Sequence, residues 1–501
     1  MLRSLFKNAV SVLAEKGVII LMTFITTPIL LNELGVTTYG VWILLINMVA
    51  WARMSNLGFG SAVTRTAAIY IERNNYSEMN SLFNSSLLLN GALGFIGIVI
   101  VSLPIFFPNI LQLPESYLDE AAFILMCLCI KVLADFVLMS ANSYFSAALK
   151  QNVVANISAL SELGKGIGTI YLVLNGYGIM GMLFALLVTD FLAFIAKLLF
   201  LKKTYPDLRL GFSFISYQQI KDIFAFSKYI LLANVALIVR KRIGVNVVSK
   251  FVGVASVATF NIAQQLVLHC ENIITIISQV ASPAATRVLN REDKSQQAKY
   301  ISMMSRLNLF STVVVLMPLL VFSDAFVRIW LGEEFIAVAF FIKLFSLMLI
   351  SKFIFYSAQS VMIAKAKHQL LPVIHIFGAV LTVTLSIVLA KLYGVIGVVS
   401  GLVIASLCTE LLFFTPILLR ELAEQRKHFM KVLLTAILAT VLLLVLAEQL
   451  DLALYINGWI KLLIAVAVFS ICNLLLFWLI SFNKHERASH VQIFRDKRKA
   501  S

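Results

Sequence analysis

The chain has 501 residues, of which 60% are hydrophobic and only 13% are charged. Soluble proteins are nearer to roughly 45–50% apolar and about 25% charged, so this composition and a mean hydropathy of +0.93 exclude an ordinary soluble protein. The formal net charge is +16, and its distribution along the chain must decide whether it indicates nucleic-acid binding or membrane topology.

Fourteen apolar segments run through the sequence, each close to the roughly 20 residues that a helix needs to cross a bilayer. The first contains Glu15 and Lys16 and lacks a small-residue cleavage pattern, so we expect a span and not a cleaved signal. These segments predict an all-α integral membrane protein. The predicted spans lie near residues 9–32, 38–56, 81–107, 120–148, 153–174, 178–201, 224–248, 254–283, 307–330, 335–363, 369–390, 395–419, 430–448 and 458–482.

Lys and Arg residues are concentrated in every second connection between these spans. The connections 57–80, 202–223 and 287–306 are basic, whereas the alternate connections carry acidic residues such as Glu115 and Glu333. Basic connections face the cytoplasm, and the termini lie on the same side. The net charge therefore indicates membrane topology and not nucleic-acid binding.

The connections leave no room for a soluble catalytic domain, since none much exceeds the length of 202–223. The sequence also lacks the phosphate-binding G-x-x-x-x-G-K-[ST] loop and the G-x-S-x-G and H-E-x-x-H motifs. Its five cysteines lie in apolar stretches without a C-x-x-C pair, which argues against a disulfide framework or a zinc site. We therefore expect no enzyme, and a membrane polysaccharide polymerase is a disfavoured alternative.

Short stretches of the first half recur in the second half at a nearly constant spacing equal to six spans. Leu34-Gly35-Val36 recurs as Val252-Gly253-Val254, and Tyr177–Gly181 recurs as Tyr393–Gly397. An even number of spans gives both copies the same orientation, which predicts a parallel repeat of two six-helix lobes. The predicted parts are a first lobe at 1–203, a cytoplasmic linker at 204–223, a second lobe at 224–420, helices 13 and 14 at 421–482 and a basic cytoplasmic tail at 483–501.

Three stretches resemble signatures of one transporter family. Leu31–Trp42 resembles the L-G-x-x-x-Y-G-x-W pattern after the first helix of polysaccharide transporters, Asn56–Arg65 resembles the end of their second helix, and Phe251–Ala263 resembles their helix 7–8 junction. The chain is thereby similar to the Wzx-type O-antigen and exopolysaccharide flippases of the multidrug/oligosaccharidyl-lipid/polysaccharide exporter superfamily. Relatives often carry an acid near the position of Arg242, and this chain departs from them there.

The resemblance implies a flippase that moves a polyprenyl-pyrophosphate-linked oligosaccharide, such as an O-antigen, capsule or exopolysaccharide unit, to the outer leaflet by alternating access. The implied partners are this lipid-linked oligosaccharide, membrane lipid, a polysaccharide polymerase and a chain-length regulator. No cofactor is implied, and coupling to Na⁺ or H⁺ stays open. The alternatives are a multidrug and toxin extrusion-type antiporter and a channel-like or scaffold protein. Cationic drugs would favour acids along the transport path, whereas pyrophosphate would favour cations.

Several charges fall inside predicted spans, where a lone charge at mid-helix costs about 2.5–3.5 kcal/mol. Lys131 with Asp135 and Glu162 with Lys165 are spaced for local pairing along one helix. The remaining mid-span charges are more often basic than acidic, which favours an anionic cargo. They are Arg53, Arg240, Lys241, Arg242 and Lys352 against Asp190, Glu271 and Glu410.

We expect Arg53 and the run Arg240–Arg242 to bind the pyrophosphate, with Lys16 and Lys352 as further cationic contacts. A helix entering near Phe224 places Arg240 about 24 Å along its axis, deep in the membrane. Successive helical residues turn by about 100°, so the three cations of the run cannot share one direction. The sequence leaves two interpretations of the mid-span acids open: pairing with Lys352 or the arginines, and coupling to protons or sodium.

The topology can be tested with single cysteines in a cysteine-free background. Glu115→Cys and Glu333→Cys are expected to react with an impermeant maleimide added outside intact cells, because both lie in acidic connections. Ser295→Cys is expected to react only after permeabilisation. The reverse labelling pattern would contradict the predicted orientation.

Overall fold

The computed structural model describes residues 2–55, 58–289, 293–365, 368–449 and 456–481. The described chain consists of helices joined by short connections, and it contains no β-strand. This confirms the all-α membrane fold. The predicted basic tail at 483–501 lies outside the described residues.

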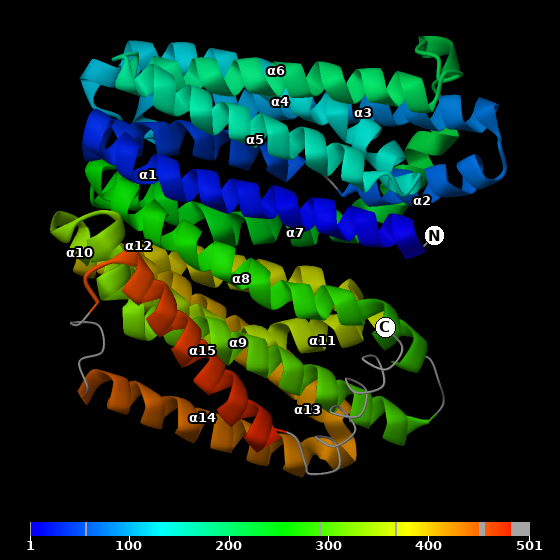
Figure 1. Cartoon of the computed structure of the whole chain (residues 1–501). Helices are drawn as coiled ribbons and strands as arrows, with labels where there is room; N and C mark the ends of the chain where they lie inside the picture. Colours follow the sequence, from blue (N-terminus) through cyan, green and yellow to red (C-terminus); the bar gives the residue numbers. More distant parts are fainter. Residues whose placement is uncertain (1, 56–57, 290–292, 366–367, 450–455, 482–501) are drawn as a thin grey trace. The chain divides into compact units, whose positions relative to one another are not determined.

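The first half of the chain forms long helices in immediate succession (Figure 1). Figure 1 shows α5 lying along α1 and α6, and residues of α5 contact both helices. The elements are α1 (Leu2–Ala52), η1 (Arg53–Ser55), α2 (Phe59–Glu72), α3 (Tyr76–Phe106), η2 (Pro108–Ile110), η3 (Glu115–Tyr117), α4 (Leu118–Ala147), α5 (Gln151–Leu174), α6 (Gly178–Thr204), η4 (Phe212–Phe214), α7 (Tyr217–Phe251) and α8 (Val254–Leu289).

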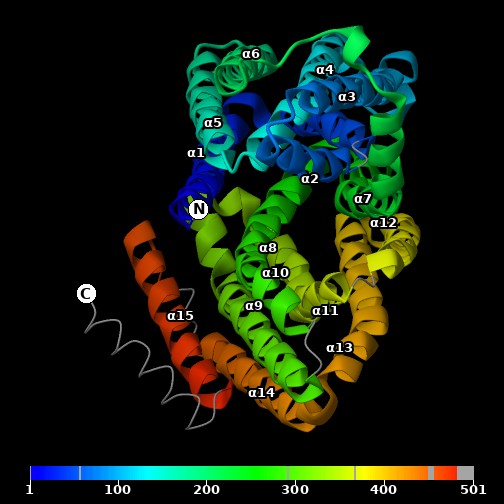
Figure 2. The same ribbon diagram turned by 90° about the vertical axis from the view of Figure 1, so that its right-hand side faces the viewer.

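The second half contains more interrupted helices, and one short segment is a π-helix. In Figure 2, α15 lies beside α9, and the two helices are in contact. The elements are α9 (Lys294–Trp330), η5 (Glu333–Phe335), α10 (Ile336–Ser346), η6 (Leu347–Ser351), α11 (Lys352–Ala364), η7 (His368–Leu370), α12 (Leu371–Thr409), the π-helix η8 (Glu410–Phe414), α13 (Thr415–Leu422), η9 (Ala423–Gln425), α14 (Arg426–Gln449) and α15 (Trp459–Ser481).

Glycine breaks explain how the helices correspond to the predicted spans. Among the described residues, nine helical runs are long and apolar enough to cross a membrane, and two of them, Lys7–Ala52 and Leu371–Gln449, are longer than one span needs. Gly35, with φ of 76°, divides the first run, and Gly394, with φ of 59°, divides the second. The run Leu371–Gln449 is broken a second time at Ala423, with φ of 43°. The long helices α7 and α8 are not among the nine. With these three breaks and the two helices included, the fold corresponds to about fourteen spans.

Backbone and side-chain features recur at the positions of the sequence repeat. Gly178 and Gly394 both have positive φ, at 53° and 59°, and each separates two successive spans. A buried hydrogen bond also recurs in each half. The Nδ2 of Asn90 donates to the Oγ of Ser140 at 2.8 Å, and the Nδ2 of Asn308 donates to the Oγ of Ser357 at 2.9 Å. These shared features support the parallel repeat.

Contacts among its residues divide the chain into two compact units. The bounds of these units differ from the lobe boundaries predicted from the repeat. The first unit contains residues 1–261, 375–383 and 390–398, and the second contains 262–374, 384–389 and 399–501. The first unit thus includes the linker and α7, although α7 is the first helix of the second copy of the repeat. The lobe boundaries predicted from the repeat describe chain duplication and stay a prediction.

Side-chain amides attach the linker to α3 within the first unit. Asn80 donates to the carbonyl oxygen of Asp207 at 3.2 Å and accepts from the backbone N–H of Arg209 at 2.6 Å. One helical turn later, Asn84 donates to the carbonyl oxygen of Arg209 at 2.8 Å and accepts from the N–H of Gly211 at 3.0 Å. Two asparagines spaced four residues apart therefore satisfy four backbone groups of an irregular segment, which would otherwise remain unpaired or solvated.

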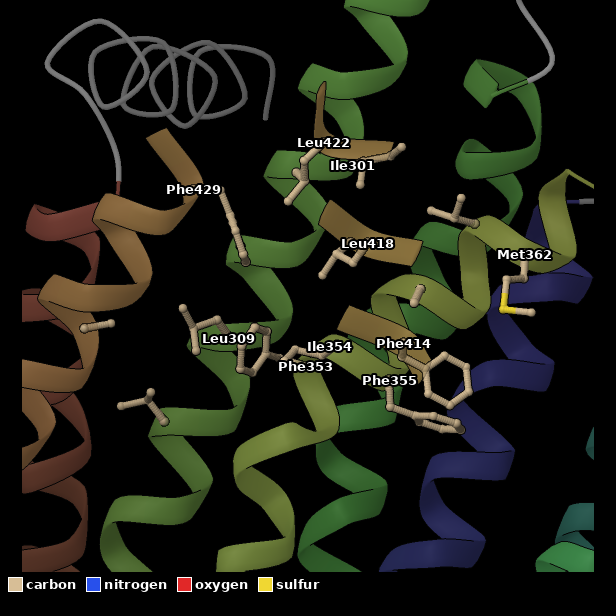
Figure 3. Packing of buried hydrophobic residues seen from close by; sticks show 14 of the residues in the cluster. Ile301, Leu309, Phe353, Ile354, Phe355, Met362, Phe414, Leu418, Leu422 and Phe429 are labelled. Atoms are coloured by element: carbon tan, nitrogen blue, oxygen red, sulfur yellow. The ribbon is translucent and has the colours of Figure 1, made fainter. Parts of the chain in front are cut away.

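The second unit is held together by a cluster of buried aromatic and aliphatic side chains (Figure 3). The rings of Phe355 and Phe414 meet edge to face with their centroids 5.1 Å apart, a favoured geometry for aromatic pairs. Phe429 of α14 is also buried in the cluster. The ring of Phe469 on α15 meets Phe322 of α9 at 5.4 Å. The two C-terminal helices therefore pack onto the second unit through buried aromatic residues.

Substitutions at the glycine breaks should destabilise the protein. Gly35→Ala and Gly394→Ala are each expected to lower the free energy of unfolding by about 1–3 kcal/mol, because an L side chain is strained at these dihedral angles. Gly91→Ala is the control, since a Cβ there meets nothing within 4 Å in α3 and alanine favours a helix by about 0.5–1 kcal/mol. Unfolding of the purified proteins in detergent measures the difference. Equal stability of all three variants would contradict the strained geometry.

Candidate functional site

A network of charged side chains crosses α4, α5 and α6 inside the first unit. The Nζ of Lys131 lies 3.1 Å from a carboxylate oxygen of Asp135 on the same helix and 2.7 Å from Asp190 on α6. The Nζ of Lys165 lies 2.7 Å from Glu162 on its own helix and 3.8 Å from Asp190. The two local pairs expected from the sequence are therefore present, and each lysine also reaches Asp190.

Asp190 is the acid that joins the two local pairs. The sequence left its partners as Lys352 or the arginines, but the structure shows two lysines of its own unit. The Oγ of Ser161 also lies 3.4 Å from its Oδ1. The helix spacing of Lys131 and Lys165 indicated local partners only, and it carried no signal for a third helix.

Arg53 lies at the edge of this network, in the short η1 segment that follows α1. Its guanidinium approaches Asp135 at 3.9 Å, and its side chain is 64% exposed. Arg53 is also close enough to Arg242 of α7 for the two positive charges to repel each other. The structure thus brings together two of the cations that the sequence assigned to the pyrophosphate site.

Hydrogen bonds beside these arginines fix α1 against α7. Asn246 lies one turn beyond Arg242, and its Oδ1 accepts from the Nδ2 of Asn47 at 2.8 Å and from the Nε1 of Trp51 at 2.9 Å. The two donors belong to the helix that ends immediately before Arg53. This buried amide contact therefore holds Arg53 and Arg242 at neighbouring places within the first unit.

The run Arg240–Arg242 lies farther from the start of α7 than the sequence indicated. The helix begins at Tyr217 and not near Phe224, so Arg240 lies about 34 Å from its start and about 16 Å from its end at Phe251. Lys241 is exposed, whereas Arg240 and Arg242 are half-buried, as expected when successive residues point in different directions. Lys16 is half-buried on α1. The break at Gly35 puts Lys16 and Arg53 at similar distances along antiparallel segments, about 28 Å and 27 Å from the turn.

A second charged cluster lies within the second unit and is more deeply buried. The Nζ of Lys352 lies 2.6 Å from Glu410 and 3.7 Å from Glu271. Ser406 donates to Glu410 at 2.9 Å, and the hydroxyl of Tyr356 donates to Glu271 at 2.7 Å. Glu410, Lys352 and Glu271 expose only 1%, 6% and 8% of their surfaces. The expected pairing of Glu410 with Lys352 is therefore present.

The π-helix at Glu410–Phe414 interrupts the regular helical register at this cluster. Such single-turn segments insert a residue into the helix and rotate the side chains that follow. The turn begins at Glu410 and ends at Phe414, which packs on Phe355. The interruption therefore lies between the charge cluster and the aromatic core, an arrangement that apolar periodicity did not predict.

The two clusters have different chemical capacities. The first is partly exposed, and the adjacent arginines add positive charge without an ion pair of Arg242 among the described residues. It is suited to contact with an anion. The second contains one base and two acids, all buried and hydrogen-bonded. In the described part of the chain, no three His, Cys, Asp or Glu side chains form a metal-binding group.

The different burial of the two clusters predicts that removing a lysine lowers the free energy of unfolding by different amounts. Lys352→Met should lower the free energy of unfolding by about 3–5 kcal/mol, because it leaves Glu410 and Glu271 buried without their cation. Lys131→Met is the matched control. Its loss should be clearly smaller, since Asp190 keeps Lys165 and is 25% exposed. Thermal unfolding in detergent, with Lys352→Met/Glu410→Leu as a partial rescue, checks this order; equal losses would contradict it.

Several solved structures share the fold of the whole chain. The fold is similar to an inward-facing multidrug resistance MATE family transporter of the MOP superfamily, with a TM-score of 0.63, 15% identity and coverage of 82% of this chain and 98% of that one. It is similar to the lipid II flippase MurJ in an inward closed conformation, with a TM-score of 0.62, 16% identity and coverage of 92% and 97%. The fold is also similar to the MATE transporter VcmN of Vibrio cholerae, with a TM-score of 0.59, 14% identity and coverage of 85% of this chain and 97% of that one. At these identities, the likeness shows the fold.

The sequence comparison identifies the family. No curated protein matches the chain significantly. The model of a family described as polysaccharide biosynthesis protein matches residues 5–289, which is more than half of the chain. This multi-pass membrane protein therefore belongs to the polysaccharide biosynthesis protein family.

Proposed function

We propose that the protein is a flippase for a polyprenyl-pyrophosphate-linked oligosaccharide and not an enzyme. It moves an O-antigen, capsule or exopolysaccharide unit from the cytoplasmic to the outer leaflet of the bacterial inner membrane by alternating access. Both termini lie in the cytoplasm. The family and the fold support a transporter that serves polysaccharide biosynthesis, and the positive-inside pattern supports the orientation.

The exposed arginine in the first unit is the observation that carries this proposal. An arginine that is 64% exposed next to a long apolar helix is strongly disfavoured against hydrocarbon, and such residues face water-filled cavities in membrane proteins. Within the described part of the chain, Asp135 at 3.9 Å is the acid that pairs with Arg53, and it already contacts Lys131 at 3.1 Å. Arg53 and Arg242 together thus offer positive charge that internal acids compensate only in part.

A pyrophosphate suits this arrangement better than a cation does. The planar guanidinium gives bidentate, charge-assisted hydrogen bonds to phosphate oxygens. Several weakly engaged cations can bind the headgroup and still release it. Lys16 and Arg240 are proposed as further contacts in the first unit, with Arg53 and Arg242 as the first pair. Lys352 of the second unit is proposed as a headgroup contact only in a state in which its pairs with Glu410 and Glu271 open.

A drug antiporter is the second candidate because MATE transporters share the fold. Cationic cargo would require acids that are accessible and not already paired. Glu271 and Glu410 are buried, and Lys352 and Tyr356 occupy their oxygens. Asp190 is contacted by two lysines. The distribution of charge therefore favours anionic cargo.

The buried cluster of the second unit supports ion coupling within the same proposal. Lys352 faces two carboxylates, so the fully ionised cluster carries one negative charge in a water-poor environment. One H⁺ or Na⁺ would neutralise it. Glu271 and Glu410 are proposed as the coupling acids, and Asp190 is the corresponding acid of the first unit. A polysaccharide polymerase, a chain-length regulator and membrane lipid are the proposed partners, and no cofactor is required.

The proposal predicts strong effects of the first-unit arginines. Arg53→Ala and Arg240→Ala should each abolish surface glycan in a deletion strain at normal protein level, while lipid-linked sugar accumulates inside. Arg53→Lys should restore part of the activity, because it keeps the charge and loses the planar fork. Lys250→Ala is the control, an exposed cation at the end of the same helix α7. Full activity of both arginine-to-alanine variants would remove this assignment, and intact glycan with altered drug tolerance in the deletion strain would favour the antiporter.

A further inference from the structure

A recess that contains several polar side chains lies in the first unit where α2, the end of α4 and the start of α5 meet. Its volume is about 480 Å³, and its polar lining includes Ser61, Thr64, Arg65, Asn142, Ser146 and Gln151. Asn142 lies about two helical turns beyond Asp135 on α4, so the recess is separate from the Lys131–Asp190 network. The neighbouring connection contains Lys150, and this end of the unit is predicted to face the cytoplasm.

The lining has hydrogen-bonding capacity that the helices do not use. The Oδ1 of Asn142 is buried and has no hydrogen-bond partner among the described residues. The hydroxyl of Ser61 donates to the carbonyl of Gly58 at 2.8 Å, and that of Thr64 donates to the carbonyl of Ser143 at 3.3 Å. Each hydroxyl still has acceptor lone pairs. An unsatisfied buried amide oxygen costs free energy, so a ligand in the recess that donates a hydrogen bond to Asn142 would be stabilised there.

The recess also has a charge preference. Arg65 is exposed at its rim, and no carboxylate is among its lining residues. A ligand with several hydroxyl groups and a negative charge satisfies both the amide and hydroxyl lining and the guanidinium. The volume falls in the lower part of the roughly 300–1,000 Å³ typical of small-molecule sites. It is therefore suited to one phosphorylated sugar and not to a whole oligosaccharide.

We propose that this recess binds the first sugar and the adjoining phosphate of the lipid-linked oligosaccharide on the cytoplasmic side, before the headgroup reaches Arg53. This inference rests on the proposed flippase function and assigns it a loading site. The hydroxyls of the sugar donate to Asn142 and Thr64, and Arg65 contacts the phosphate. A phospholipid headgroup with hydroxyls and a phosphate has the same chemistry, so the test separates the two sources.

Protection of a single cysteine tests the site directly. Ser146→Cys in a cysteine-free protein, held in phosphatidylcholine nanodiscs, is labelled with a maleimide. The probe is water-soluble citronellyl-pyrophosphoryl-N-acetylglucosamine, compared with inorganic pyrophosphate and with nanodiscs that contain phosphatidylglycerol. We expect the sugar probe to slow labelling at least fivefold, pyrophosphate to act more weakly, and phosphatidylglycerol to have no effect.

Variants of the lining should weaken this protection. Asn142→Leu and the nearly isosteric Thr64→Val should each raise the half-protecting probe concentration roughly tenfold, as expected for a lost hydrogen bond in a buried site. Thr66→Val is the matched control on α2, because Thr66 is not among the lining residues, and it should leave protection unchanged. If Asn142→Leu fails to fold, Thr64→Val still provides the measurement.

Three outcomes would overturn the inference: no protection by the sugar probe, equal protection in the lining variants, or protection by phosphatidylglycerol alone. The last would assign the recess to a membrane lipid. Surface glycan in the deletion strain separates this inference from the flippase proposal. If the lining variants keep wild-type glycan while Arg53→Ala abolishes it, the loading site fails and the flippase stands. If the wild-type gene does not restore glycan, the flippase itself fails.

Discussion

A charge inside a bundle of apolar helices needs a counter-charge or water, and both units of this protein are organised around that requirement. In the second unit, Lys352 meets two acids at the junction of α11 and a π-helical turn, with Tyr356 and Ser406 completing the hydrogen bonds. In the first unit, Lys131 and Lys165 share Asp190 across three helices. The difference is exposure, because only the first network extends to a largely exposed arginine.

The repeat shows what duplication kept and what it changed. Each copy retains an amide-to-hydroxyl bond of Asn90 with Ser140 or of Asn308 with Ser357, and each retains a glycine turn between successive spans. These features set helix spacing and direction, and they do not depend on cargo. The charges occupy similar spans but have diverged into an open network and a closed one. One copy is therefore suited to contact with cargo, and the other to stability and ion coupling.

The connection between the copies is also part of the architecture. The sequence predicted a basic cytoplasmic linker at 204–223, and the structure shows that Asn80 and Asn84 bind its backbone to α3. The amides of Asn47 and Asn246 likewise hold α7 to α1. Side-chain amides are effective here because each donates and accepts, which satisfies backbone groups that have no helix of their own. These contacts make α7 a member of the first compact unit although it begins the second copy of the repeat.

The sequence by itself determined the membrane class, the approximate spans and the local pairs of Lys131 with Asp135 and Glu162 with Lys165, and it predicted the parallel repeat. Apolar length, glycine position and helical spacing are local properties, so they can be read along the chain. Only the tertiary structure decided that Asp190 joins those pairs, that Arg53 approaches Arg242, and that Asn142 lines a recess with Thr64 and Arg65. Each of these contacts joins residues on different helices. Whether they meet depends on how whole helices rotate and pack against one another. The hydropathy pattern of a chain with so few charged residues does not specify that packing.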